Sequence, residues 1–366
     1  MGARQGQPRA SLRRPLLAPA RSQQQEQQPS LVMSLAEGTY RPSALCPLYD
    51  SGERFNCAAA DPNYAESLWA GASLDVSRFR RAFATSALFF VGDSFTEQHM
   101  RATACALRAW NATETFIPAA KCFLNMNFHD IAQVEEDEGR GVARVCYVQA
   151  GKGWQDRTTV EAFHAIERSG ELSKGSVLIV NEGLWYRVER GNSSAAANLS
   201  ASMRHGELER ARAWGRVDLA ALDRRAVRVV WRETSAQHFR TPRATGMWPG
   251  RPGLINLHLP KEPCRPLAPT ELRGGEQRRR ADDVNRALPS AVRVLPLFNA
   301  SAAGWRSHIE RHTPHGRSIR GRDCSHFCEP SPLFEEANAA LLELLHEPPR
   351  PRARIRHPAR RRVRRR

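Results

Sequence analysis

A single serine directly follows a short apolar run, a position that is typical of a nucleophile. The run Ala87–Val91 ends at Gly92-Asp93-Ser94, and a helical pattern starts at once. In a parallel sheet this place is the carboxyl edge, where ligands bind. The first N–H groups of a helix have no partners within the helix and favour negative charge, so Ser94 could attack an acyl group and stabilise the oxyanion with its own N–H. A tight turn without chemistry is the alternative, because Gly-Asp-Ser also arises by chance.

A serine nucleophile needs a base, and the best of the twelve histidines is His326. It lies in the stretch RDCSHFCEPSP, between Cys324 and Cys328, after the last apolar run and before the last helical pattern. Asp323 could orient the imidazole and stabilise it when it is charged. We therefore expect Ser94 to meet this pair in space. We also expect a disulfide from Cys324 or Cys328 to tie the loop to an earlier segment. A surface loop with an unrelated Asp and His is the alternative.

A second turn could assist the oxyanion. The stretch VNEGLWY, residues 180–186, ends another apolar run. The side-chain amide of Asn181 and the backbone N–H of Gly183 could donate to the same oxyanion as Ser94. An ordinary turn at the end of a strand explains these residues equally well.

The apolar pattern predicts a scaffold that brings these turns to one edge. Four runs of strand length are typical of buried parallel strands, and they cover residues 87–91, 176–181, 226–231 and 291–298. Helical patterns cover residues 95–110, 208–224 and 332–345, the last with Ser331 as N-cap and proline at the first position. The alternation predicts an α/β fold, a three-layer α/β/α domain with a parallel central sheet. The Pro/Gly-rich stretch 232–285 is predicted to be a long surface insertion.

Composition divides the chain into a disordered N-terminal segment, 1–45, an ordered domain, 46–346, and a disordered tail, 347–366. The formal net charge is +17, and residues 348–366 contribute ten arginines and no acid. Such a tail attracts polyanions, or it is simply solvated. It has no aromatic residues that could stack on bases, which argues against nucleic acid as a partner.

Cysteines and sequons point to the secretory pathway, in the Golgi or outside the cell. Eight scattered cysteines without zinc-type spacing suit up to four disulfides in an oxidising compartment. Four N-glycosylation sequons begin at Asn111, Asn192, Asn198 and Asn299, where composition alone would give about one. A cytosolic protein with buried free thiols is the alternative. No signal peptide or membrane anchor is visible, so we expect the N-terminus to be incomplete.

Four stretches and one cysteine resemble the trichome birefringence-like and PC-esterase family of polysaccharide O-acetyltransferases and esterases. FFVGDSFTEQHMRATACAL is similar to the family's FVGDS block, which is followed by a helix with a cysteine, here Cys105. VNEGLWY is similar to its Asn-x-Gly-x-Trp block, and WRETSAQHF to its Arg-x-x-Ser-x-x-His-Phe block. Cys264 falls where the family has a cysteine, and DCSHFCEPSP is similar to the closing DCSHWC-x-P block, with Phe327 in place of Trp. The resemblance spans Cys46 to Leu345.

The resemblance implies an SGNH/GDSL-hydrolase-like fold with Ser94 as nucleophile, His326 as base and Asp323 as the acid that orients the base. It implies an O-acetyltransferase that moves an acetyl group from a donor to hydroxyls of a polysaccharide or glycan through an acetyl-serine. A carbohydrate acetylesterase that uses the same three residues is one alternative. A non-catalytic carbohydrate-binding module on the same fold is another. No metal or redox cofactor is implied.

The third block implies substrate-binding roles for Arg232, Ser235 and His238. For His238, a histidine packed under the insertion is an equally good interpretation. Glu233 and Ala236 replace the family's usual Thr and Pro. These departures bear on acceptor recognition more than on the three catalytic candidates.

Overall fold

The computed structural model describes part of the chain, and all of that part belongs to one compact unit, Gly38–Arg366. The described residues are Cys57 and the ranges 74–83, 86–108, 132–135, 142–150, 158–181, 207–239, 263–309, 317–318 and 321–346. The two segments predicted to be disordered, 1–45 and the arginine-rich tail 347–366, lie outside them. Three of the four sequons also lie outside the described residues.

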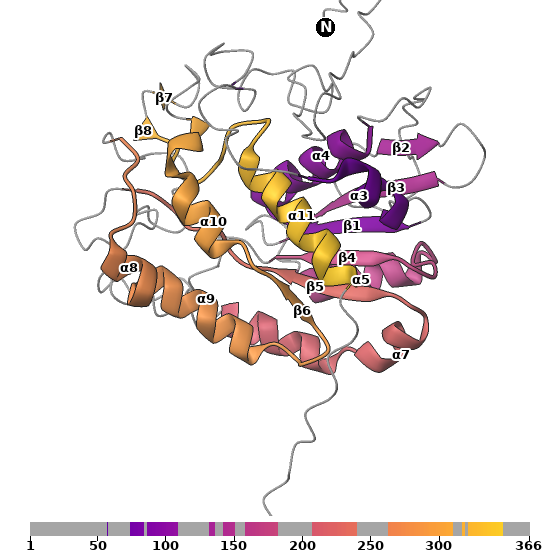
Figure 1. The fold of residues 1–366 in the computed structure, drawn as a ribbon. Helices are drawn as coiled ribbons and strands as arrows, with labels where there is room; N and C mark the ends of the chain where they lie inside the picture. Colours follow the sequence, from indigo (N-terminus) through magenta and orange to yellow (C-terminus); the bar gives the residue numbers. More distant parts are fainter. Residues whose placement is uncertain are drawn as a thin grey trace, which may run out of the picture. The chain divides into compact units, whose positions relative to one another are not determined.

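Six strands form one sheet in the order β2-β3-β1-β4-β5-β6 (Figure 1). Their bounds are β1 Ala87–Gly92, β2 Ala132–Glu135, β3 Val142–Gln149, β4 Val177–Val180, β5 Arg228–Arg232 and β6 Arg293–Leu295. The five strands from β3 to β6 pair in parallel, and β2 is antiparallel at the edge. A separate two-stranded ribbon consists of β7 (Arg317–Ser318) and β8 (Gly321–Arg322). The predicted α/β class, with helices on both sides of a parallel sheet, is confirmed.

All four predicted strands are present, but the sequence predicts neither the short strands β2, β7 and β8 nor the longer β3. Arg144 interrupts the apolar residues of this strand, so it lacks the continuous apolar run of its neighbours. β4, β5 and β6 are shorter than the runs that predicted them.

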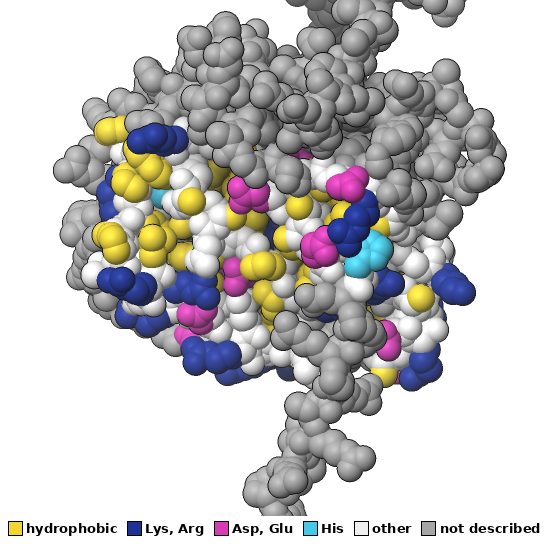
Figure 2. All heavy atoms as spheres, in the orientation of Figure 1, with side chains coloured by type: hydrophobic (Ala, Val, Ile, Leu, Met, Phe, Trp, Pro, Cys, Tyr) yellow, Lys and Arg dark blue, Asp and Glu magenta, His cyan; other side chains and the backbone are white. Residues whose placement is uncertain are grey.

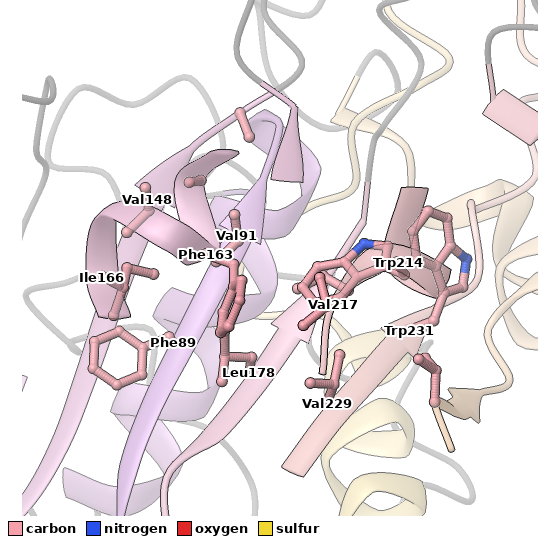
Figure 3. Close-up of a cluster of buried hydrophobic side chains, with 14 of the residues drawn as sticks. Phe89, Val91, Val148, Phe163, Ile166, Leu178, Trp214, Val217, Val229 and Trp231 are labelled. Atoms are coloured by element: carbon pink, nitrogen blue, oxygen red, sulfur yellow. The ribbon is translucent and has the colours of Figure 1, made fainter. Parts of the chain in front are cut away.

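One face of the sheet packs against α5 (Thr159–Arg168), η1 (Trp214–Arg216) and α7 (Leu219–Arg224). Alternate residues of a strand point to the same face, so Phe89 and Val91 lie on this side together. Figure 3 shows the cluster, with strand side chains meeting Phe163 of α5 and Trp214 of η1. Its labelled members are Phe89, Val91, Val148, Phe163, Ile166, Leu178, Trp214, Val217, Val229 and Trp231.

The opposite face is covered by α4 (Ser94–Arg108) and α11 (Pro332–His346), with α3 (Val76–Phe83) beside them (Figure 1). Phe90 of β1 points to this side and packs on His99 of α4, with ring centroids 5.1 Å apart. Phe95 of α4 meets Phe334 of α11 at 5.2 Å. The helix that starts at Ser94 is therefore held between the sheet and the last helix.

Two predictions about the middle of the chain are wrong in part. The predicted helix 208–224 is interrupted, because Asp218 accepts a hydrogen bond from the Ala221 N–H and starts α7 as a new helix. The second half of the predicted insertion 232–285 contains α8 (Pro269–Gly274) and α9 (Glu276–Ala287). The buried face of α9, with Ala281 and Val284, is hard to recognise among its charged residues. Residues 240–262 lie outside the described part.

The strand order creates a switch point next to β1. In chain order the five parallel strands are β1, β3, β4, β5 and β6, so the sheet reads second, first, third, fourth, fifth. The chain passes from β1 to β3 on one side of β1, and then adds β4, β5 and β6 on the other side. In such sheets the ligand crevice lies at the carboxyl ends of the strands beside this reversal. Ser94 follows β1 at that edge, and Asn181 follows β4.

The surface of the described part carries charges of both signs. On the face in Figure 2, Lys and Arg side chains are interspersed with Asp and Glu and with small groups of hydrophobic side chains. None of the described helices is long and apolar enough to cross a membrane.

Candidate active site

Ser94, His326 and Asp323 form a continuous hydrogen-bonded set. Ser94 Oγ lies 2.8 Å from His326 Nε2, and His326 Nδ1 lies 2.7 Å from Asp323 Oδ2. Both distances are within the range for proton transfer between a nucleophile, a base and its orienting acid. The structure therefore brings together the three residues that the sequence predicts to meet.

The carboxylate of Asp323 is fixed by its own loop. Its Oδ1 accepts hydrogen bonds from the backbone N–H groups of Ser325 and His326, at 3.0 and 3.1 Å. Burial by itself would raise the pKa of Asp323. The charge of His326, the hydrogen bond from its ring and the two backbone N–H groups outweigh burial and hold that pKa well below its usual range. Asp323 is therefore ionised and accepts a proton-bearing Nδ1, which leaves the lone pair of His326 Nε2 facing Ser94.

The turn before Ser94 depends on its glycine and its aspartate. A Cβ at Gly92 would lie 2.3 Å from Thr96 Oγ1 and 2.5 Å from the Asn181 carbonyl oxygen, so only glycine fits. Asp93 Oδ1 accepts hydrogen bonds from the backbone N–H groups of Phe95 and Thr96, at 3.1 and 3.2 Å. Asp93 is thus the N-cap of α4, and it leaves Ser94 at the first helical position.

The backbone N–H of Ser94 remains available for an oxyanion. Within the described part of the chain no group accepts a hydrogen bond from it. The N-terminus of α4 adds a favourable field for negative charge at this point. The Ser94 N–H is the oxyanion donor that the structure supports.

Asn181 has a different role from the predicted one. Its side-chain Nδ2 donates to the Arg232 carbonyl oxygen at 2.8 Å and to Thr234 Oγ1 at 3.2 Å. Both amide hydrogens are therefore used to join the ends of β4 and β5, and neither is free for an oxyanion. Gly183, the other predicted donor, lies outside the described residues.

Arg232 supports the serine turn from inside the protein and does not line an open surface. Its side chain is 1% exposed. It donates to the Phe95 carbonyl oxygen at 3.1 Å and to Thr96 Oγ1 at 2.8 Å. Burial lowers the pKa of Arg232 to about 10, although the carboxylate of Asp93, 3.9 Å away, opposes that shift. The guanidinium therefore stays charged at neutral pH and holds the first turn of α4.

The other two predicted substrate-binding residues are also buried. Ser235 is 4% exposed and His238 is fully buried, with its ring against His308 and the Ala302 carbonyl oxygen. For His238 the structure agrees with the alternative interpretation, a packed histidine. Because all three residues are buried, this arrangement does not support direct contact of Arg232, Ser235 and His238 with a substrate. The sequence motif that suggested this role contains no information about burial.

The base loop, residues 323–328, is anchored on both sides. Disulfides join Cys57 to Cys328 and Cys264 to Cys324, with Cα separations of 5.3 and 5.4 Å. Gln98 is a third anchor, which the sequence motifs do not predict. Its Nε2 donates to the Phe327 carbonyl oxygen at 2.6 Å, and its Oε1 accepts the Phe327 N–H at 3.3 Å.

The position of Gln98 contains the signal that could have identified it. Gln98 is four residues after Ser94, so the two residues lie one above the other on the same side of α4. A polar side chain on the side of a helix that carries the nucleophile is a candidate for holding the partner loop.

Comparison with known proteins does not assign this geometry to a family. No family model matches the chain, and no curated protein is significantly similar to it. The resemblance to the trichome birefringence-like family therefore rests on its motifs. In the described residues no cluster of three or more His, Cys, Asp or Glu side chains could hold a metal ion.

Proposed function

We propose that this protein is a serine acyltransferase with Ser94 as nucleophile, His326 as general base and Asp323 as the residue that orients the base. The contact between Ser94 Oγ and the unprotonated Nε2 of His326, at the switch point of the sheet, carries this proposal. An ionised, hydrogen-bonded Asp323 behind the ring supports it, because this arrangement favours the reactive tautomer.

In the first half-reaction Ser94 Oγ bonds to the carbonyl carbon of an acyl donor while its proton moves to His326 Nε2. The carbonyl oxygen becomes an oxyanion that accepts a hydrogen bond from the Ser94 N–H. Collapse of this intermediate breaks the bond to the leaving group, which takes the proton from His326. The product is an acyl-serine.

The second half-reaction reverses these steps with an acceptor hydroxyl. His326 takes the acceptor's proton, the acceptor oxygen bonds to the acyl carbon, and Ser94 leaves and recovers a proton. We infer acetyl as the acyl group and a polysaccharide or glycan as the acceptor from the motif resemblance. If water is the acceptor, the same residues make an acetylesterase, since the first half-reaction is shared.

The proposal is tested by mass spectrometry of the intact and digested protein after incubation with 4-nitrophenyl acetate. We expect an acetyl adduct on the peptide that contains Ser94, and none on the Ser94→Ala variant. The matched control is Ser290→Ala, which removes an exposed serine between α9 and β6 and should label normally.

The same experiment separates the remaining possibilities. Loss of the adduct on addition of a glycan, with acetylated glycan formed, indicates a transferase. Loss of the adduct to water alone indicates an esterase. Absence of both an adduct and 4-nitrophenol release with the folded, unsubstituted protein would overturn the catalytic proposal in favour of a carbohydrate-binding module.

A further inference from the structure

Two buried histidines lie beneath the base loop and contact each other. His238 follows β5, and His308 follows η2 (Gly304–Ser307). His238 Nδ1 is 2.6 Å from His308 Nε2, and both residues are fully buried. Neither is part of the catalytic set, so their arrangement needs a separate explanation.

Each ring also faces a backbone carbonyl oxygen with its other nitrogen. His308 Nδ1 is 2.7 Å from the carbonyl oxygen of His326, and His238 Nε2 is 3.2 Å from that of Ala302. A carbonyl oxygen can only accept, so a hydrogen bond at either place requires a proton on the ring nitrogen. Together with the contact between the rings, three N–H groups would be needed on four nitrogens.

Two neutral imidazoles have only two N–H groups, so one of the three contacts lacks a proton. If the proton were missing from either of the two short contacts, 2.6 and 2.7 Å, two lone pairs would face each other at close range. The 3.2 Å contact to Ala302 is the longest of the three and tolerates this best. In the favoured neutral arrangement both rings therefore have the proton on Nδ1.

The surroundings oppose a third proton. Burial is the main cause that lowers the pKa of His238, and the charges of His308 and Arg265 lower it further, while the Ala302 carbonyl opposes them. Arg265 forms a two-pronged ion pair with Glu271, at 2.7 and 2.8 Å.

The remaining charged groups lie on the neighbouring segments. The base loop contributes Asp323 and His326, and η2 contributes Arg306, which is exposed. None of these is among the groups that raise the pKa of His238. His238 therefore stays neutral near neutral pH.

We propose that His308 is a positioning residue for the catalytic base, and that His238 holds it in the tautomer that can donate to the His326 carbonyl. The donation from Nδ1 fixes the backbone of the very residue whose ring must face Ser94. Among the described residues the Ile309 N–H also donates to this oxygen, at the longer distance of 3.4 Å. The role in positioning rests on the proposed function; the tautomer does not.

The ring of His308 reinforces this contact by packing. It lies 4.3 Å from the ring of Phe327, and the two residues form a β-bridge. His308 therefore holds the base loop by one side-chain hydrogen bond, one bridge and one ring contact. Only the hydrogen bond depends on the position of a proton.

The first test uses the tautomer and requires no activity. In the unsubstituted, ¹⁵N-histidine-labelled protein at pH 7.5, we expect His308 and His238 to have bare Nε2 and protonated Nδ1. Signals are assigned by their loss in His308→Asn and His238→Gln. A protonated Nε2 with a bare Nδ1 on His308 would overturn the proposal, whether or not the protein proves to be an enzyme.

The second test measures the rate at which a fluorophosphonate labels Ser94. His308→Phe keeps a ring beside Phe327 but cannot donate, and we expect a rate at least about tenfold lower, because small displacements of a catalytic group are costly. His308→Asn can donate from the position of Nδ1, and we expect it to restore the rate to within about threefold. The control His164→Asn, on the outer side of α5, should label normally.

The two His308 variants together distinguish a role of the hydrogen bond from a role of packing. Equal and low rates for His308→Phe and His308→Asn would mean that the ring acts by packing alone. Normal labelling of His308→Phe would remove the positioning role altogether. Failure of the unsubstituted protein to label would refute the proposed function while the tautomer result still stands.

Discussion

The reactivity of Ser94 depends on which nitrogen of His326 carries the proton. Asp323 accepts from Nδ1, and Ser94 then finds an unprotonated Nε2 at 2.8 Å. Because the pKa of Asp323 lies far below neutrality, this residue should stay ionised over any practical assay range. The acid limb of the pH–rate profile should then follow the protonation of His326 alone.

Replacement of Asp323 by Asn should abolish most of the activity while leaving the fold intact. An Asn amide can donate to Nδ1 and so favours the tautomer with the proton on Nε2, which cannot act as a base towards Ser94. We expect a loss of about 10⁴-fold in kcat, by analogy with other Ser-His-Asp enzymes. The measurement is the hydrolysis rate of 4-nitrophenyl acetate.

The control for this change is Asp223→Asn, at an exposed position in α7, which should leave the rate unchanged. A loss of less than about tenfold for Asp323→Asn would show that Asp323 does not set the tautomer.

At the scale of helices and strands, the local parts of the site could be predicted and the tertiary parts could not. β1, the turn at Gly92 and the start of α4 follow from an apolar run, a glycine and a cap, which are all local. The burial of Arg232 and His238 depends on what packs above them, so a motif alone suggested the wrong surroundings. β3 was missed for a related reason, because its apolar residues are recognisable as a strand only beside β1.

Helix α11 contains a buried carboxyl group that makes stability depend on pH. Glu335 of α11 is 1% exposed. Burial raises the pKa of Glu335 to about 8, although the Asn338 side chain opposes the shift. The folded protein therefore keeps a proton on Glu335 that the unfolded chain releases above about pH 4.5.

Replacement of Glu335 by Gln should stabilise the protein increasingly between pH 5 and pH 8. Above the unfolded pKa the unfolded chain gains free energy by ionising, so the native protein loses stability as pH rises towards 8. Gln removes this loss, which is on the order of 1.4 kcal/mol per pKa unit at most. The free energy of unfolding in urea, measured at pH 5 and pH 8, should show the variant gaining only at the higher pH.

A glutamate on the exposed side of the same helix provides the control. Glu343→Gln should not show this pH-dependent gain. A gain for Glu335→Gln that is equal at both pH values would rule out a buried titrating group.

At the scale of the whole molecule, two disulfides tie the base loop to different parts of the chain. Cys328 is bonded to Cys57 and Cys324 to Cys264, and Cys105 and Cys146 are disulfide-bonded as well. These bonds agree with the predicted oxidising compartment, since disulfides are rare in the cytosol. Location in the secretory pathway stays a prediction.

Removal of the Cys264–Cys324 bond should weaken both the fold and the site. The bond closes a loop of 60 residues, for which the chain-entropy model gives about 4 kcal/mol. In the double variant Cys264→Ser/Cys324→Ser we expect a lower free energy of unfolding and slower labelling of Ser94, since the bond lies one residue from Asp323.

Dithiothreitol provides the comparison for this variant. It should slow labelling of the unsubstituted protein and have a smaller effect on the double variant. Unchanged labelling and stability after removal of the bond would show that the loop is held by its hydrogen bonds alone.

The contact between Ser94 and His326 joins residues 232 positions apart. The serine turn consists of neighbours in sequence and can form as soon as β1 and α4 do. Its base arrives only when the chain has returned across the sheet, and contacts of such long range form late and slowly in folding. A partly folded chain can thus have most of its helices and strands while Ser94 is still unreactive. Recovery of Ser94 reactivity during refolding should lag behind recovery of helical circular dichroism, so that reactivity reports completion of the native topology.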